Sequence, residues 1–303
     1  MNISKNLKYF FILPAILSIA AAVAIIAWGL KPGIDLSGGS LLQVSYPAGR
    51  PSIEMVHAGV DKLGLGEVRV QPSGEFDYIL RQHDLTPEEK NTLMQPLRNL
   101  GEMEEVQYTS VGPVIGQELL GKGLLALGLV TISIILFIAF AFRHVSKPVA
   151  SWKYGVVAII TLAHDVLIPT GLFAFLGHFH GAEVDSLFIV GLLTILGISI
   201  NDTIVVFDRI RENLRLNEEH RKREEFDEVV GRSIMQTLAR SINTSLTVVI
   251  VLAALWILGP ASTKDFALTL IVGMVAGTYS SMFLASPLLV AWNNFSHRKV
   301  AAK

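Results

Sequence analysis

Apolar residues in this chain are gathered into six long runs separated by polar stretches. A hydrocarbon core of about 30 Å is crossed by about 20 apolar residues in a helix. Runs of about that length or more cover residues 9–29, 123–142, 154–177, 185–207, 240–258 and 266–292. The pattern predicts an α-helical polytopic membrane protein with six transmembrane helices. The last run is long enough to be tilted or broken, and Pro287 is a candidate for its end.

The first run also has features of a signal peptide. Lys5 and Lys8 precede it, and the segment Ala-Val-Ala at residues 22–24 resembles a cleavage site. The core of a signal peptide has roughly 7–15 apolar residues, and this run is longer. We therefore expect the first run to be retained as a membrane anchor.

Positively charged residues predict the orientation, because Lys and Arg are in excess in cytoplasmic loops. They lie before the first run, between the second and third, between the fourth and fifth, and after the sixth: Lys5, Lys8, Arg143, Lys147, Lys153, Arg209, Arg211, Arg215, Arg221, Lys222, Arg223, Arg232, Arg298, Lys299 and Lys303. The short loops on the other side, residues 178–184 and 259–265, hold only Lys264. We predict that both termini are cytoplasmic and that residues 30–122 face the far side, which in a bacterium is the periplasm or exterior.

Residues 30–122 are long enough for a folded domain and carry signals for four strands and two helices. Strand-like stretches cover residues 41–46, 67–71, 76–82 and 104–110, and helical stretches cover residues 52–63 and 86–100. The second helix begins with a capping box of Thr86 and Glu89, with Pro87 at the first helical position. The order β-α-β-β-α-β predicts an α+β ferredoxin-like periplasmic domain, a fold that hosts many functions.

The runs divide the chain into six parts. We expect a cytoplasmic N-terminus with the first transmembrane helix (1–29), the periplasmic domain (30–122), transmembrane helices 2–4 (123–207), a cytoplasmic amphipathic connector (208–239), transmembrane helices 5 and 6 (240–292) and a cytoplasmic tail (293–303). Apolar residues recur at helical spacing within the connector: Phe226, Val229, Val230, Ile234 and Leu238. This face lies on the membrane or a partner, or is a single apolar stripe on a solvated segment.

An acidic residue, Asp202, lies inside the fourth apolar run. A charged side chain near the bilayer centre costs about 2.5–3.5 kcal/mol on insertion scales, so such residues usually have a partner or a function. Arg240 opens the fifth run, and antiparallel neighbours would bring the two to similar depth. Our hypothesis is a proton relay in which Asp202 gains and loses a proton beside Arg240; a static ion pair or a polar contact between helices is the alternative. Five polar neighbours would support the relay: Asn201, Thr203, Asn243, Thr244 and Thr247.

A second pair of ionisable residues, His164 and Asp165, lies near the middle of the third run. The pair could be a second relay station, a counter-ion for Arg240, or a contact that only fixes helix packing. Small residues line one face of the last run and predict close helix packing: Gly273, Ala276, Gly277, Ser280, Ser281 and Ala285.

Composition limits the chemistry of the chain. Its net charge of −1 disfavours a nucleic-acid partner, and its lack of cysteine excludes disulfides and thiolate metal sites. His178 and His180 are spaced like metal ligands, but we interpret them as loop residues because no further ligand is evident. The nucleotide-binding pattern G-x-x-x-x-G-K-[ST] is absent. We therefore predict no enzyme, no catalytic residue, no metal and no cofactor, and a source of work in an ion gradient or a partner.

Four motifs together resemble the SecF family, the membrane subunits of bacterial protein export. Residues 197–213, GISINDTIVVFDRIREN, resemble the signature of the family's fourth span. GIDLSGGS at residues 33–40, SVGPVIGQEL at 110–119 and ARSINTSLT at 239–247 resemble three others, in order and at fitting spacings. The match covers nearly the whole chain. Leu36 and Ile198 depart from it, at positions where family members often have an aromatic residue.

The resemblance implies a protein of the bacterial inner membrane and of the resistance-nodulation-division superfamily. Such a subunit pairs with SecD and uses the proton gradient to assist preprotein translocation through SecYEG with SecA, with YajC as a further partner. The family's proton residues correspond to Asp202 and Arg240 here. Six spans are also one repeat of a transporter that needs two, which independently predicts a partner of similar architecture.

Three other functions stay open at this point. The chain could be half of a proton-coupled small-molecule or lipid exporter of the same superfamily, or a scaffold without ion coupling. An intramembrane aspartyl protease using Asp165 and Asp202 is disfavoured, because no protease motif surrounds either residue.

Overall fold

The chain folds into two compact units in a computed structural model that describes residues 3–141 and 149–301. One, the helical unit, consists of Met1–Lys31, Ala126–Ala182 and Leu187–Lys303. The other, the sheet unit, consists of Pro32–Leu125 and the short segment Glu183–Ser186. Part of the loop that we expected between the second and third spans, residues 142–148, and the last two residues of the predicted tail lie outside the described residues.

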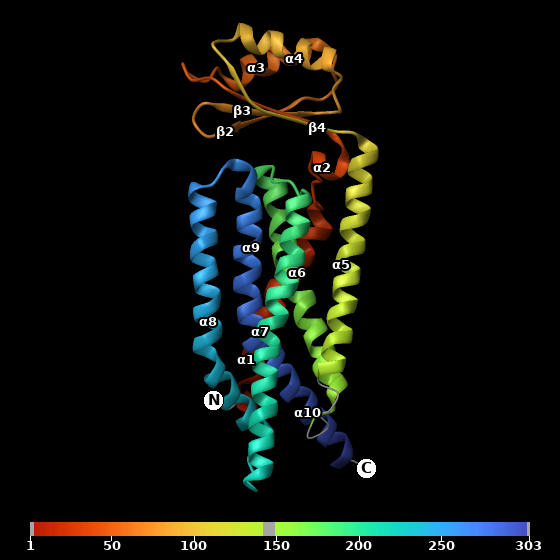
Figure 1. The fold of residues 1–303 in the computed structure, drawn as a ribbon, viewed down its shortest axis with the longest axis vertical. Helices are drawn as coiled ribbons and strands as arrows, with labels where there is room; N and C mark the ends of the chain where they lie inside the picture. Colours follow the sequence, from red (N-terminus) through yellow and green to blue (C-terminus); the bar gives the residue numbers. More distant parts are fainter. Residues whose placement is uncertain (1–2, 142–148, 302–303) are drawn as a thin grey trace. The chain divides into compact units, whose positions relative to one another are not determined.

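Long helices dominate the chain (Figure 1). They are α1 (Ile3–Trp28), α5 (Pro113–Ala141), α6 (Ser151–His180), α7 (Ser186–Glu219), α8 (Phe226–Leu258), α9 (Ala261–Ser280) and α10 (Ser286–Ala301). By length and composition, six segments of the described chain could cross a membrane. The prediction of a six-span polytopic membrane protein is therefore confirmed. Most of these helices extend beyond the apolar runs, since a helix does not have to end where its polar residues begin.

The predicted connector at residues 208–239 consists of the ends of two membrane helices rather than a separate element. α7 continues to Glu219 and α8 begins at Phe226, so only a tight turn separates them. The apolar stripe of this segment, beginning with Phe226 and Val229, is buried in the chain's own core instead of facing lipid or a partner. It packs there with Phe207 and Ile210 of α7.

The last apolar run is interrupted, but Pro287 does not end it. A π-helical turn, η2 (Ser281–Ala285), lies between α9 and α10, and Pro287 is the second residue of α10. Proline lacks the N–H that would bond the carbonyl of residue 283, one turn earlier. Single π turns inside α-helices are frequent at functional sites.

The helices of the helical unit pack through small residues. Ideal Cβ atoms on Gly273 and Gly277 of α9 would lie 2.2 Å and 3.0 Å from Ile195 and Ser199 of α7. The packing interpretation of the small-residue face is thus confirmed for these two glycines. The outer faces of α1, α5 and α8 expose many large apolar side chains, among them Ile26, Leu129 and Ile250, as expected of surfaces solvated by lipid.

Gly171 of α6 is the position where α1 approaches most closely, and we expect Gly171→Ala to destabilise the chain. Its added Cβ would lie 2.4 Å from the Cα and Cβ of Ala21. Overpacking of this kind typically costs about 1–3 kcal/mol, so thermal denaturation of the detergent-solubilised protein should shift to lower temperature. Gly128→Ala on α5 is the matched control, because no atom lies within 4 Å of its ideal Cβ. Equal melting temperatures for both variants would contradict the proposed close contact.

The sheet unit contains a four-stranded antiparallel sheet with two helices on one face (Figure 1). Its elements are α2 (Ile34–Ser37), β1 (Gly39–Ser45), α3 (Ile53–Val60), η1 (Asp61–Leu63), β2 (Arg69–Ser73), β3 (Asp77–Gln82), α4 (Pro87–Asn99) and β4 (Glu104–Val111). The strand order β2-β3-β1-β4 is that of a split βαβ arrangement. The predicted ferredoxin-like α+β fold is therefore confirmed, with only the short helix α2 added.

Local sequence signals in the sheet unit act as expected. Thr86 and Glu89 form the predicted capping box of α4, and the hydrogen bonds from Thr86 lower the pKa of the Glu89 carboxyl. The core between sheet and helices holds Leu42, Leu80 and Leu93, all fully buried. Tyr46 is also buried and donates a hydrogen bond to the Leu97 carbonyl at 3.0 Å; burial raises the pKa of Tyr46 to about 12.

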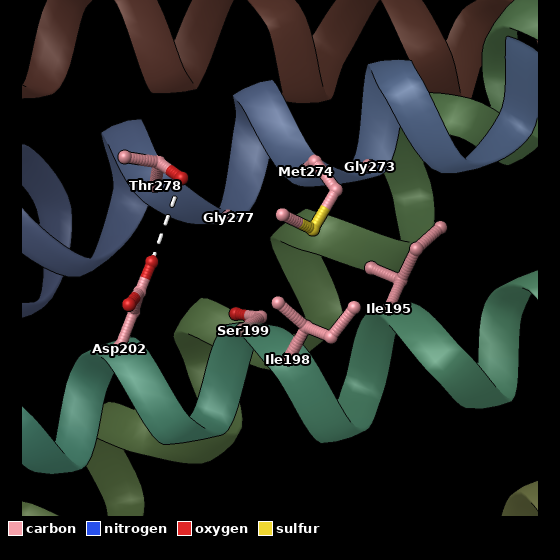
Figure 2. A pocket seen from close by; sticks show the side chains of 8 residues that line it. All are labelled: Ile195, Ile198, Ser199, Asp202, Gly273, Met274, Gly277 and Thr278. Atoms are coloured by element: carbon pink, nitrogen blue, oxygen red, sulfur yellow. Dashed lines mark hydrogen bonds between the residues drawn. The ribbon is translucent and has the colours of Figure 1, made fainter. Parts of the chain in front are cut away.

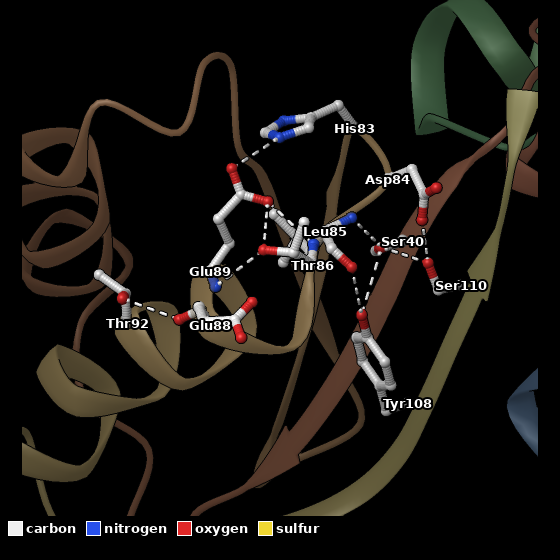
Figure 3. A network of polar contacts seen from close by, with 10 residues as sticks. All are labelled: Ser40, His83, Asp84, Leu85, Thr86, Glu88, Glu89, Thr92, Tyr108 and Ser110. Carbon is white, nitrogen blue, oxygen red and sulfur yellow. Dashed lines mark hydrogen bonds and ion pairs between the residues drawn. The ribbon is translucent and has the colours of Figure 1, made fainter.

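Two of the sequence motifs meet in this unit. Ser40 of GIDLSGGS pairs in register with Ser110 of SVGPVIGQEL, and their hydroxyl oxygens lie 2.9 Å apart (Figure 3). The Leu85 amide donates to Ser40, and Ser110 donates to Asp84, so the loop before α4 is fixed to both strands. Gly38 has φ +80° and lies so close to Pro113 that a side chain would clash. These motifs therefore have a structural explanation in backbone contacts.

Candidate functional site

Asp202 lies on α7 within the helical unit, with 7% of its surface exposed. It borders a narrow crevice between α7 and α9 with an empty volume of about 160 Å³. Figure 2 shows the lining side chains: Ile195, Ile198, Ser199, Asp202, Gly273, Met274, Gly277 and Thr278. Its lining is mostly apolar but includes the hydroxyls of Ser199 and Thr278. The carboxyl is thus a buried ionisable group among apolar side chains and a few hydroxyls.

The Asp202 carboxyl is only weakly held. Thr278 Oγ1 of α9 donates to Asp202 Oδ2 at 3.5 Å (Figure 2), which is long for a bond between oxygens. The same Thr278 hydroxyl lies 2.5 Å from Ser245 Oγ of α8, so one hydroxyl pair connects α8, α9 and the acid. No salt bridge engages Asp202 among the described residues. Its charge state is therefore not fixed by a permanent counter-ion.

Arg240 lies near this acid without bonding to it. The positive charge of Arg240 acts on the Asp202 carboxyl, yet no ion pair within 4.0 Å joins the two among the described salt bridges. The side chain is exposed on α8, and Arg240 is in the interior of this helix rather than at its start. The pair predicted from sequence is thus brought together as neighbours, not as a closed salt bridge.

The α7–α8 hairpin explains this neighbourhood. Asn213 donates to Ser233 at 2.8 Å, and Arg209 donates to Gln236 at 2.7 Å. Because α7 and α8 are antiparallel, residues with higher numbers on α8 lie opposite residues with lower numbers on α7. Continuing the register therefore brings Arg240 close to the part of α7 just beyond Asp202. These two cross-links, which lie outside the apolar runs, set the distance between the charges.

Of the five supporting polar residues, one is buried and four are exposed. Thr203 is buried, and its hydroxyl lies 2.9 Å from Ser281 Oγ in the π-helical turn η2. The other four lie on exposed positions, Asn201 on α7 and Asn243, Thr244 and Thr247 on α8. The three on α8 follow Arg240 along one exposed face of that helix, since residues three and four apart share a helix face.

The hydroxyls that do surround the acid were not predicted from sequence. Ser199, Ser245 and Thr278 come from three helices, and only folding brings them together. A partial signal exists, because Thr278 lies on the small-residue face of the last run. Ser245 lies inside the ARSINTSLT motif, but its spacing gave no reason to choose it over Thr244.

His164 and Asp165 form a direct contact in the interior. His164 Nδ1 lies 2.9 Å from Asp165 Oδ1, and their side chains are 4% and 0% exposed. Ser199 of α7 donates a hydrogen bond to the other carboxyl oxygen, Oδ2. Among the described residues, no salt bridge joins the pair to Arg240. Asp165 and Asp202 each have their own hydroxyl partner, and no hydrogen bond joins the two carboxyls in the described chain.

His178 and His180 are not in a loop, because α6 extends to His180. The ring of His178 stacks on Trp28 of α1, with centroids 5.4 Å apart. In the described residues no group of three or more His, Cys, Asp and Glu side chains could hold a metal ion. Stacking thus accounts for His178 as a contact within the helical unit.

Comparison with known proteins relates the whole chain to protein export. Residues 92–295 match the family described as protein export membrane protein SecD/SecF, C-terminal. The protein translocase subunit SecF of Thermobaculum terrenum is 41% identical over 299 residues, which cover 94% of this chain and 92% of that protein. The protein translocase subunit SecDF of Bacillus subtilis is 31% identical over 307 residues. The match covers 100% of this chain and 39% of that longer protein.

A solved structure is similar as well. The crystal structure of SecDF from Thermus thermophilus, described as a translocon-associated membrane protein, matches with a TM-score of 0.84 and 32% identity. The match covers 97% of this chain and 39% of that chain. The similarity therefore extends over both units of the fold described above.

Proposed function

We propose that this chain, which belongs to the SecF family of protein translocase subunits, works with a SecD subunit and uses the proton gradient to assist preprotein translocation through SecYEG with SecA. The observation that carries this proposal is the buried Asp202 carboxyl, which has a nearby guanidinium but no permanent ion pair. An acid of this kind can take up a proton and release it again, whereas a closed salt bridge would hold it charged.

The burial of Asp202 supports a cycle rather than an open channel. Its carboxyl borders a small crevice between two helices and has little exposed surface. Protons would reach Asp202 only when α7 and α9 move apart. Such movement suits a machine in which proton transfer and a change of conformation depend on each other. Gly273 and Gly277 on α9 leave room for the side chains of Ile195 and Ser199 of α7 to pack directly against the α9 backbone.

The polar face that α8 exposes supports the proposal of a partner subunit. Arg240, Asn243 and Thr247 are exposed in the isolated chain, on a helix long and apolar enough to cross a membrane. Placing one guanidinium in lipid costs about 2.5–3.5 kcal/mol or more, so we infer that another subunit covers this face. The SecDF relative from Bacillus subtilis contains further sequence beyond the part similar to this chain, and a SecD subunit is the corresponding partner here.

The proposed location is the bacterial inner membrane, with both termini and the α7–α8 turn in the cytoplasm and the sheet unit in the periplasm. The start of α1, the end of α10 and the α7–α8 turn lie at the same end of the helical unit (Figure 1). Basic residues are concentrated at this end, which supports a cytoplasmic location. The assignment of the sheet unit to the periplasm rests on the same asymmetry.

Cysteine labelling tests this orientation, because the chain contains no cysteine of its own. We expect a cysteine at Glu75, in the exposed β2–β3 turn, to react with a membrane-impermeant maleimide added to intact spheroplasts. A cysteine at Glu219, at the end of α7, should react only after the membrane is permeabilised. The reverse order of labelling would show that the proposed topology is inverted.

The proposed function itself is tested by removing the ionisable group. Asp202→Asn should eliminate the part of preprotein export that depends on the proton gradient, as argued in the Discussion. A scaffold without ion coupling would tolerate this change. Half of a small-molecule or lipid exporter would lose drug or lipid efflux, with normal preprotein export.

A further inference from the structure

His164 has a buried ring nitrogen that the contacts within the chain leave unused. Its Nδ1 contacts Asp165 Oδ1, but its Nε2 is buried and has no hydrogen-bond partner in the described chain. Buried polar atoms of folded proteins nearly always have a partner, so each exception requires an explanation. Leu162 and Phe173 on the same helix are buried too, as are the hydroxyl-bearing residues Thr161 and Ser199.

In the state with Asp165 ionised, its carboxylate can only accept hydrogen bonds, so Nδ1 of His164 is the donor. In a neutral ring, Nε2 is then an unprotonated nitrogen with a free lone pair. The pair as a whole carries one negative charge. One added proton at Nε2 makes the ring positive and the pair neutral, and no other bond has to form or break.

Ser199 connects this pair to the crevice that Asp202 borders. Its hydroxyl donates to Asp165 Oδ2 across the α6–α7 contact. On α7 it lies three residues before Asp202, and Figure 2 shows both side chains along the same crevice. Residues three apart on a helix are neighbours at roughly 5–6 Å between Cβ atoms. A single hydroxyl therefore separates the His164–Asp165 pair from the wall of the proposed proton site.

We propose that His164 and Asp165 form a second proton-binding site, coupled to Asp202 through Ser199. This inference rests on the proposed function. Asp165 and Asp202 are both buried, and negative charges in a protein interior repel each other more strongly than in water. A proton bound at one site therefore favours release of the proton from the other. The chain would pass through states in which either the His164–Asp165 pair or Asp202 holds one proton.

Few other charged groups can act on this pair. Among the described residues, α1, α9, α10 and η2 pack against α6, and α7 contacts it through Ser199. Within the apolar runs of these elements, apart from Tyr9 at the start of α1, the ionisable side chains are Asp202 on α7 and Tyr279 on α9. Asp202 is therefore the carboxyl of a neighbouring helix that can act on the pair.

Two variants and one control test the second site in the membrane-embedded complex with its partner subunit. His164→Gln removes the basic nitrogen, and Ser199→Ala removes the connection while leaving both acids in place. Ser280→Ala is the control, because Ser280 is also fully buried but donates only to the Gly277 carbonyl of its own helix. Gradient-driven export is measured in vesicles over a range of pH, and infrared difference spectra after an acid step report protonation of the histidine ring.

We expect both variants to shift the pH profile of export by about one pH unit or more, the size that a nearby charge commonly produces. His164→Gln should also lose one imidazole protonation signal, while Ser280→Ala should match the parent protein in both measurements. If His164→Gln does not accumulate, the pH profile of Ser199→Ala decides alone. Profiles and spectra identical to the parent, with Asp202→Asn still inactive, would overturn this inference and leave the proposed function intact. If Asp202→Asn exports normally, the proposed function fails, and the inference fails with it.

Discussion

Asp202→Asn is expected to reduce gradient-dependent preprotein export to the level seen without a gradient. Asparagine has the same shape and can accept the hydrogen bond of Thr278, so the helix packing around the crevice should persist. It cannot ionise, and therefore it cannot exchange a proton. The measurement is export of a reporter preprotein into inverted membrane vesicles, with and without an ionophore that collapses the proton gradient.

The control for this prediction is Asp208→Asn. Asp208 lies six residues later on the same helix, with its side chain 57% exposed and paired with Arg211 at 2.8 Å. Exposed pairs of this kind contribute about 0–1 kcal/mol, so export should be unchanged. The amount of each variant in the membrane is compared by immunoblot. Gradient-dependent export by a normally accumulated Asp202→Asn protein would refute the proton-relay proposal.

Arg240→Ala is expected to have a similarly large effect on gradient-dependent export, for a different reason. Its guanidinium acts on the Asp202 carboxyl from a neighbouring helix without closing a salt bridge. Without this charge, the proton affinity of Asp202 no longer responds to the position of α8. Arg240→Lys keeps a positive charge on a flexible side chain but loses the planar donor set of arginine. We therefore expect lysine to preserve part of the activity that alanine eliminates.

Arg211→Ala is the matched control for Arg240, because it removes a positive charge outside the apolar runs. Arg211 is 46% exposed and pairs only with Asp208. Export should stay at the parent level in this variant. The same vesicle assay is used, with thermal denaturation to verify that each protein is folded. Equal export by Arg240→Ala and Arg211→Ala would show that the charge of Arg240 has no role in coupling.

The elements of the fold were largely predictable because their signals are local. The six spans follow from the length of the apolar runs, since the bilayer requires about 20 apolar residues for each helix. The helix α4 begins where Thr86 and Glu89 predict, because a capping box involves only residues three apart. The order of strands and helices then limits the sheet unit to few topologies.

The limits of helices and the partners of side chains were less predictable. Apolar composition located Arg240 at the start of a span, but α8 begins at Phe226, because hydrogen bonding along a helix continues through polar residues. Pro287 was expected to end the last span, yet the π turn at Ser281–Ala285 accommodates the missing N–H. The apolar stripe near Val229 was left open between a face on the membrane or a partner and a stripe on a solvated segment, because the sequence could not show that it packs with Phe207.

The sequence by itself determined that ionisable residues lie at membrane depth, and which ones they are. An acid inside an apolar run is visible without a structure, because its cost of insertion depends on the residue and its neighbours in the chain. The tertiary structure alone decided what each acid contacts. Asp165 is held by His164 and Ser199, whereas Asp202 has one long contact with Thr278 and no salt bridge among the described residues. These contacts join residues up to 76 positions apart, and only the packing of α6, α7 and α9 against one another sets such distances.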